Sequence, residues 1–191
     1  MLYNVVLFVH IFGAVVMFMA IGILFTAMIS MLHAKGREQI VQWSSLAVKL
    51  DGLMPLSTLL ILVPAVYLVF AGWGWGIAWI NVSLAILVAN SIVGPIVNLR
   101  RLKVILQAAN SETDSVLSTA LMGKVRDRVL WSSVSIMTML TVGILFLMAV
   151  KLPLLGSLVT MVIAAAAGLV LANVLLARTK PATSPDTAAI K

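Results

Sequence analysis

The order of apolar and polar residues divides the chain into long apolar runs, separated by short segments that carry nearly all of the charged residues. A helix of about 20 apolar residues crosses about 30 Å of hydrocarbon. The uncharged stretch 52–99 is too long for one crossing and suits two, with the break at the glycine-rich segment 71–76. The pattern predicts five helices, at about residues 3–29, 52–71, 77–98, 129–150 and 152–177.

The composition identifies the solvent that these helices require. The chain has 191 residues, of which 62% are hydrophobic and 10% are charged. Soluble domains are about 45–50% apolar and about 25% charged. We therefore expect an all-α, polytopic transmembrane helical bundle that forms one domain over residues 1–177. Residues 178–191 carry two prolines and small polar residues, which are typical of a disordered tail.

The segments between the helices are predicted to be short inner loops, at 33–51 and 99–128. Within the second loop, Ser111 and Asp114 have the spacing of a capping box, which favours the start of a short helix. We expect that helix to run into the fourth span, with a break near Gly123. On the opposite side, three tryptophans lie where indoles favour the boundary of the lipid headgroups: Trp73, Trp75 and Trp79.

The basic residues predict an orientation. Twelve of the thirteen lysines and arginines lie on one side of a five-helix topology, and Lys151 alone lies on the other. Because cytoplasmic segments of membrane proteins are enriched in basic residues, we expect the N-terminus outside and the C-terminus in the cytoplasm. The net charge of +7 then reflects topology and anionic lipid headgroups rather than nucleic acid. We expect the headgroups to bind Arg100, Arg101 and Lys103.

Motifs of soluble enzymes are absent from the sequence, and no catalytic residue or metal site is predicted. The chain has no cysteine, which excludes thiolate metal sites and disulfides. Its eleven methionines suit Cu(I), but methionine is also an ordinary packing residue. All six acidic residues fall outside the predicted spans, Asp51 among them, which argues against proton-coupled transport.

His10 is the one histidine inside a predicted span, and no lysine, arginine, aspartate or glutamate lies in any of the five spans. An ionisable group in a membrane helix is a functional hypothesis by default. Gly13 and Met17 share its helix face, and the small Gly13 leaves room for a close helix or for a flat ligand. Neutral imidazole is a good axial ligand for haem iron. A structural role, in which His10 bonds a polar group of a neighbouring helix, remains the alternative.

His33 is the other histidine, 23 residues further along. That separation corresponds to about 34 Å on a continuous helix. The two histidines therefore cannot bind one metal ion within one chain. We expect His33 to be a solvated residue at the cytoplasmic boundary.

Three stretches of the sequence carry a family resemblance: "FVHIFGAVV" (8–16), the Gly/Trp turn followed by Trp79 and Ile80, and "PIVNLRRL" (95–102). With these stretches the chain resembles a family of short bacterial integral membrane proteins of unknown function. More distantly it is similar to the J-type membrane protoporphyrinogen oxidases and to the copper-resistance D proteins. The resemblance implies a multi-pass protein of the bacterial inner membrane, with His10 placed to handle haem or a porphyrin.

Three functions follow as hypotheses. The chain binds haem b or a porphyrin through His10, with Gly13 and Met17 beside it. Alternatively, it is an accessory or assembly subunit, either in a homo-oligomer or in a larger membrane complex. A third reading is a small-solute transporter, because Asn90, Ser91 and Asn98 are able to line a polar cavity; they are equally able to satisfy one another across a helix pair.

Overall fold

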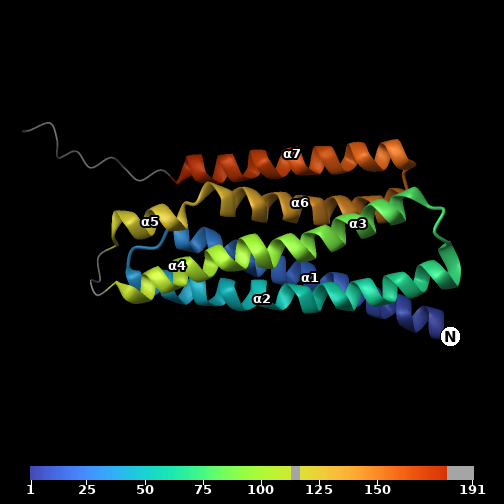
Figure 1. Ribbon diagram of the computed structural model, residues 1–191, viewed down its shortest axis with the longest axis horizontal. Helices are drawn as coiled ribbons and strands as arrows, with labels where there is room; N and C mark the ends of the chain where they lie inside the picture. Colours follow the sequence, from blue (N-terminus) through green and yellow to red (C-terminus); the bar gives the residue numbers. More distant parts are fainter. Residues whose placement is uncertain (113–116, 180–191) are drawn as a thin grey trace, which may run out of the picture.

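The computed structural model describes residues 1–112 and 117–179. The described residues are all-helical, and they contain five helices long and apolar enough to cross a membrane. The number and order of the predicted helices are therefore confirmed. Figure 1 shows the long helices side by side with their axes roughly parallel. The elements are α1 (Leu2–Leu32), α2 (Arg37–Leu68), η1 (Val69–Trp73), α3 (Ala78–Val93), η2 (Gly94–Leu99), α4 (Arg100–Ser111), α5 (Thr119–Val125), α6 (Arg128–Val150) and α7 (Leu154–Arg178).

Two predicted inner loops are largely helical instead. The segment predicted as loop 33–51 turns only at residues 33–36, and α2 begins at Arg37. Likewise α3 passes through the π-helical turn η2 into α4, so the third helix continues to Ser111. Apart from the buried Asp51, the charged residues of both extensions are exposed or partly exposed, and each extension buries one face. A count of apolar residues per span does not detect such a face.

The segment after α4 also differs from the prediction. Ser111 ends α4 rather than capping a new helix, and Asp114 lies outside the described residues. Ser118 caps α5 instead, its hydroxyl accepting a hydrogen bond from the Leu121 amide. The break before α6 falls at 126–127 rather than at Gly123, because the Asp127 side chain caps α6 there.

The two ends of the bundle differ in composition. The basic end carries the turn 33–36, α5 and the last turn of α7. The tryptophan end carries the N-terminus, the turn 74–77 and the turn 151–153. In Figure 1, α5 and the α1–α2 turn extend beyond α6 and α7 at the basic end. Of the predicted tail 178–191, Arg178 belongs to α7, and residues 180–191 lie outside the described residues.

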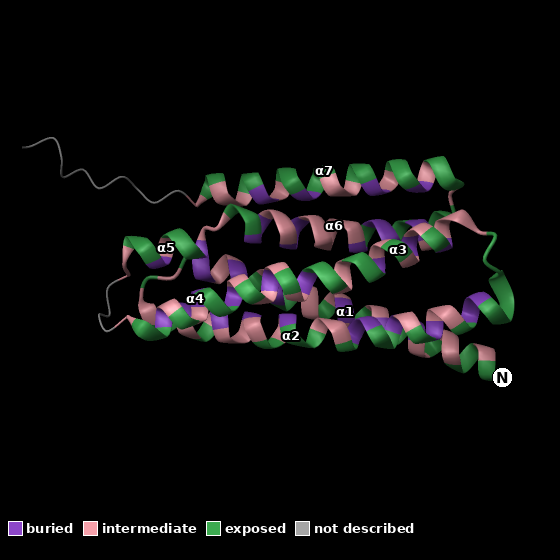
Figure 2. Ribbon diagram, in the orientation of Figure 1, coloured by how far each residue is buried: buried purple, intermediate pink, exposed green. Residues whose placement is uncertain are grey.

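The main core lies at the basic end. It joins buried residues of α1, α2, α4, α5, α6 and α7, among them Met28, Ile40, Leu102 and Leu130. Trp131 is fully buried there, and its indole N–H donates to the Val125 carbonyl, 3.0 Å away. A smaller core at the tryptophan end contains Met17, Ile61, Leu87, Ile144, Leu147 and Met161. Figure 2 shows that the outward faces are largely exposed, most clearly on α7.

Candidate functional site

His10 is buried and bonded to the backbone of a neighbouring helix. Its Nδ1 lies 3.0 Å from the carbonyl oxygen of Ile61 on α2. A carbonyl only accepts, so Nδ1 carries the proton and donates it. The neutral imidazole then has its lone pair on Nε2. A hydrogen bond from one ring nitrogen to a carbonyl is the arrangement that orients metal-ligating histidines. It is also the structural contact that the sequence left open.

Gly13 allows α2 to approach α1 closely at this point. A Cβ atom on Gly13 would lie 3.1 Å from the Leu60 carbonyl oxygen and 3.1 Å from Cγ1 of Ile61. Pro64 has no N–H to donate to the Leu60 carbonyl four residues earlier, which weakens α2 here. The space beside Gly13 is therefore filled by the α2 backbone. A flat ligand does not fit there.

A cavity of about 350 Å³ opens beside His10, between α1, α2 with η1, α3 and α6. Met17 lines the cavity together with His10, whereas Gly13 is not among the lining residues. Apolar side chains make up most of the wall, as is usual for sites that bind small organic ligands. Three other polar side chains face the cavity: Ser83, Thr141 and Lys151. Of these, Ser83 is buried and its hydroxyl has no hydrogen-bond partner among the described residues.

Aromatic residues and a lysine surround the tryptophan end of this cavity. The Lys151 ammonium lies 4.7 Å from the centroid of the Trp73 ring, within range of a cation–π interaction. Trp73 also packs edge-on against Trp79, with ring centroids 5.7 Å apart. Its indole N–H donates to the Tyr3 hydroxyl, 3.2 Å away. These contacts hold the Lys151 ammonium beside the cavity. Among the described residues, Lys151 is the only lysine or arginine at this end of the bundle.

A second, smaller cavity of about 70 Å³ lies nearer the basic end, between α1, α2, α3 with the η2 turn, and α6. The residues Asn90, Ser91 and Asn98, which the sequence suggested for a polar cavity, all line it. Asp51 lines it too, and Met17, Leu87 and Thr141 separate it from the first cavity by contributing to both walls.

The placement of Asp51 in a loop was wrong. It lies within α2 and is only 3% exposed. The signal was present in the spacing, because Asp51 continues a buried stripe at intervals of three and four residues that runs through Ile40, Ser44 and Ala47. That stripe was masked by the exposed Lys49 and Glu38 on the other face of the same helix.

The predicted headgroup residues have different environments. Arg100 and Lys103 are exposed, while Arg101 forms an ion pair with Asp127, the residue that caps α6. Two other arginines serve helix ends. Arg37 donates to the Ala109 carbonyl at the end of α4, 2.7 Å away, and Arg126 donates to the Leu176 carbonyl at the end of α7, 2.8 Å away.

The described residues contain no group of three or more histidine, cysteine, aspartate or glutamate side chains that could hold a metal ion. Comparison of the chain with protein-family models, curated proteins and solved structures finds no match.

Proposed function

We propose that this chain is a multi-pass protein of the bacterial inner membrane that binds haem or another porphyrin in the cavity beside His10. The membrane placement is supported by the exposed large apolar side chains. On α1 they end at Ile23, on α2 they begin at Leu53, and none is exposed between residues 24 and 52. On α7 they extend from Leu154 to Val174. These exposed apolar segments, 2–23 on α1 and 154–174 on α7, contain 22 and 21 residues. A helix of that length spans about 32 Å, close to the thickness of bilayer hydrocarbon.

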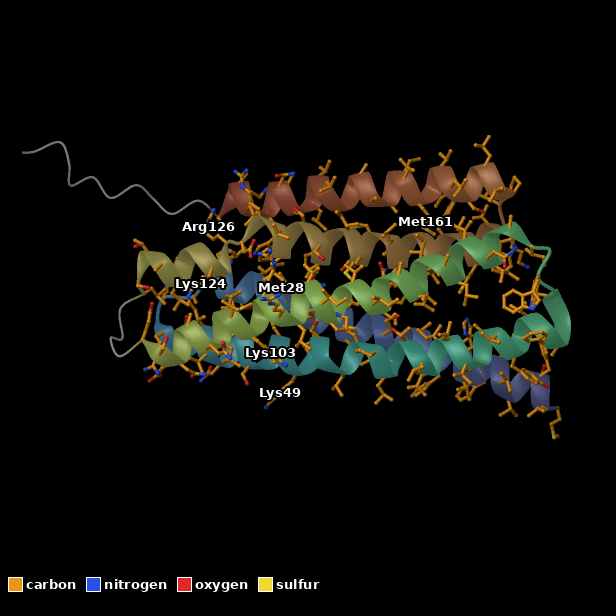
Figure 3. All side chains as sticks on the ribbon, in the orientation of Figure 1. Met28, Lys49, Lys103, Lys124, Arg126 and Met161 are labelled. Carbon is orange, nitrogen blue, oxygen red and sulfur yellow. The ribbon has the colours of Figure 1, made fainter. Side chains whose placement is uncertain are left out.

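With this boundary, the end of α1, the start of α2, the end of α4 and all of α5 form a helical extension in water at the basic end. Figure 3 shows Lys49, Lys103, Lys124 and Arg126 in this half of the bundle and Met161 in the other. The distribution supports an orientation with the basic end in the cytoplasm and the N-terminus outside. Arg100 and Lys103 then lie near the boundary, exposed to anionic headgroups.

The observation that carries the porphyrin proposal is the bond from His10 Nδ1 to Ile61. It fixes the tautomer in which Nε2 is free to ligate iron, and it does so in a helix that borders a largely apolar cavity. Met17 lies two helical turns after His10 on the same face of α1 and also lines the cavity. Lys151 supplies a positive charge for a carboxylate of the ligand. A haem bound there would supply one-electron chemistry.

Titration of the purified full chain with haemin tests this proposal. The expected result is a Soret band with a red shift from free haemin that saturates near one haemin per chain. His10→Ala should abolish the shifted band. His33→Ala is the matched control, because His33 is exposed at the end of the same helix and should leave the spectrum unchanged.

Metal-free protoporphyrin separates ligation from cavity binding. If His10 ligates iron, His10→Ala should weaken binding of haemin at least tenfold and binding of protoporphyrin much less. Loss of both ligands to the same degree would assign His10 a structural role, in which its bond to Ile61 holds α1 against α2. Failure of the wild-type chain to bind either ligand would refute the proposed function.

Small-solute transport is a second candidate, favoured by one observation. Asn90, Ser91 and Asn98 all line the second cavity, although the amide groups of Asn90 and Asn98 also donate to Met137 on α6. Uptake by proteoliposomes is the measurement that tests it. The buried carboxylate in that cavity supplies a more specific inference.

A further inference from the structure

Asp51 presents a buried carboxylate without a compensating charge. Its Oδ2 atom has no hydrogen-bond partner among the described residues, and the one ion pair recorded there joins Arg101 to Asp127. Within residues 1–112 and 117–179, no lysine, arginine or histidine lines the cavity that Asp51 faces, and Lys49 on the same helix is exposed. An ionised carboxylate buried in this way is costly unless a positive charge binds beside it.

A second oxygen in the same cavity is also unpartnered. Asn98 is 3% exposed, and its Oδ1 atom has no hydrogen-bond partner among the described residues. Its amide Nδ2 is engaged elsewhere, donating to the sulfur of Met137 at 3.3 Å. The Nδ2 group of Asn90 donates to the Met137 carbonyl at 3.4 Å. Met137 therefore takes up amide donors of both asparagines, and the oxygen of Asn98 is left for a ligand.

Most hydroxyl groups of the cavity wall also present hydrogen-bond acceptors rather than donors to the cavity. Of the four hydroxyl groups that line it, three donate their proton to a carbonyl of their own helix, which leaves the oxygen lone pairs as acceptors. The bonds run from Thr58 to Met54 at 3.0 Å, from Ser91 to Val88 at 2.7 Å and from Thr141 to Met137 at 2.8 Å. The polar part of this wall is therefore rich in acceptors and poor in free donors, which suits a cation.

Two prolines in the cavity wall add to this excess of hydrogen-bond acceptors. Pro55 has no N–H to donate to the Asp51 carbonyl, and Pro95, inside η2, has none for the Ser91 carbonyl. Both prolines line the cavity. Interrupted helices whose carbonyls are released from the helix ladder are a recurring source of ligands for Na⁺ in membrane proteins.

We propose that Asp51 and Asn98 form a binding site for one Na⁺ ion in this cavity. One carboxylate matches one positive charge, and the described residues offer no second carboxylate for a divalent ion here. A proton would neutralise Asp51, but a metal ion satisfies several oxygens at once. The cavity of about 70 Å³ is large enough, since a water molecule needs only about 10–15 Å³.

Direct binding of ²²Na⁺ to the purified full chain in detergent tests the proposal. The expected result is saturable binding near one ion per chain that excess unlabelled NaCl displaces and choline chloride does not. Asp51→Asn should abolish this binding, and it should not unfold the chain, since it removes an uncompensated charge with little change in shape. Glu38→Gln is the matched control, an acid-to-amide change at an exposed position of the same helix.

Thermal unfolding provides a second readout that does not depend on radiolabel. At constant pH and ionic strength, replacing choline with Na⁺ at ten times its dissociation constant should raise the midpoint by about 3–5 °C for the wild type. Asn98→Leu should weaken Na⁺ binding about tenfold. Asp51→Asn should unfold at the same temperature in both salts.

The proposal is overturned if the wild type binds no ²²Na⁺, or if its stability changes with pH but not with Na⁺. The latter result would show that a proton neutralises Asp51. His10→Ala should retain Na⁺ binding, because His10 does not line this cavity. The Na⁺ site and the porphyrin proposal therefore succeed or fail separately.

Discussion

The two ends of the bundle bury their side chains in different ways. At the basic end, six helices share one core, and residues such as Ala27, Met28 and Leu102 are fully buried. At the tryptophan end the core is smaller, and a cavity of about 350 Å³ takes part of the space between the helices. The cavity beside His10 lies at the looser end. The main core and the candidate porphyrin site are thus separated along the helix axes.

The proposed membrane boundary gives a physical reason for this contrast. Helices outside the lipid gain free energy by removing apolar side chains from water, so a tight core at the basic end is strongly favoured. Within lipid, a leucine that leaves the protein interior still meets hydrocarbon, and packing alone favours association. A cavity is therefore less costly at the tryptophan end.

The largest expected effect contrasts two fully buried leucines, Leu102 at the basic end and Leu147 at the tryptophan end. Leu102→Ala should lower the free energy of unfolding by about 3–5 kcal/mol, because burial from water is lost and a cavity remains. Leu147→Ala should cost about 1–2 kcal/mol, because mainly packing is lost. Unfolding in mixed micelles measures both. Equal costs would contradict the proposed boundary.

The next largest loss of stability is expected where α6 packs against α7. A Cβ atom on Gly168 would lie 2.5 Å from the Ile136 Cα, so Gly168→Ala should push the two helices apart. We expect a loss of about 1–3 kcal/mol in the free energy of unfolding. Gly22→Ala is the control, since nothing lies within 4 Å of its added Cβ. That variant should gain about 0.5–1 kcal/mol from helix propensity; a similar loss in both would argue against close packing at Gly168.

Removing the arginine that closes α7 should have a moderate effect confined to the basic end. Arg126→Ala deletes the donors to the Leu176 and Thr179 carbonyls and should cost about 1–2 kcal/mol of unfolding free energy. Hydrogen exchange in the last turn of α7 should quicken. Arg128→Ala, at an exposed neighbour, should change neither quantity. Faster exchange throughout the bundle would show instead that Arg126 supports more than this helix end.

The smallest effect is expected at Lys151, the one described non-glycine residue with a positive φ, at 59°. Lys151→Gly should raise the free energy of unfolding by about 1 kcal/mol relative to Lys151→Ala, because glycine adopts this conformation without steric cost. Both variants lose the ammonium and should bind haemin more weakly than the wild type. Unchanged haemin affinity in both would show that Lys151 acts only as a helix cap.

The sequence predicted some of these features well for a simple reason. Five long apolar runs of the right length leave little choice of element, and a charged or glycine-rich segment marks each turn. A polar partner for His10 on a neighbouring helix was one of the two roles that the sequence left open, because an imidazole in an apolar helix is driven to such a partner. The partner itself was not predictable. The Ile61 carbonyl carries no sequence signal, and only the approach of α2 at Gly13 brings it to the imidazole.

The errors have one origin. Segments with several charged residues were interpreted as loops, although 37–51 and 100–111 are amphipathic helices. Counting charges along the chain does not show on which face of a helix they lie. Asp51 was placed in a loop for this reason, and a buried carboxylate beside Asn98 was missed.

The sequence by itself determined the helical class, the five apolar helices and the segregation of basic residues, because these depend on composition and on spacing within single segments. Tertiary structure alone decided which groups meet: His10 with Ile61, Lys151 with Trp73, and Asp51 with Asn98 around one cavity. Those meetings join residues 40 or more positions apart, and they depend on how closely each helix pair packs. That closeness is set by side-chain shape across the interface, which no local pattern records.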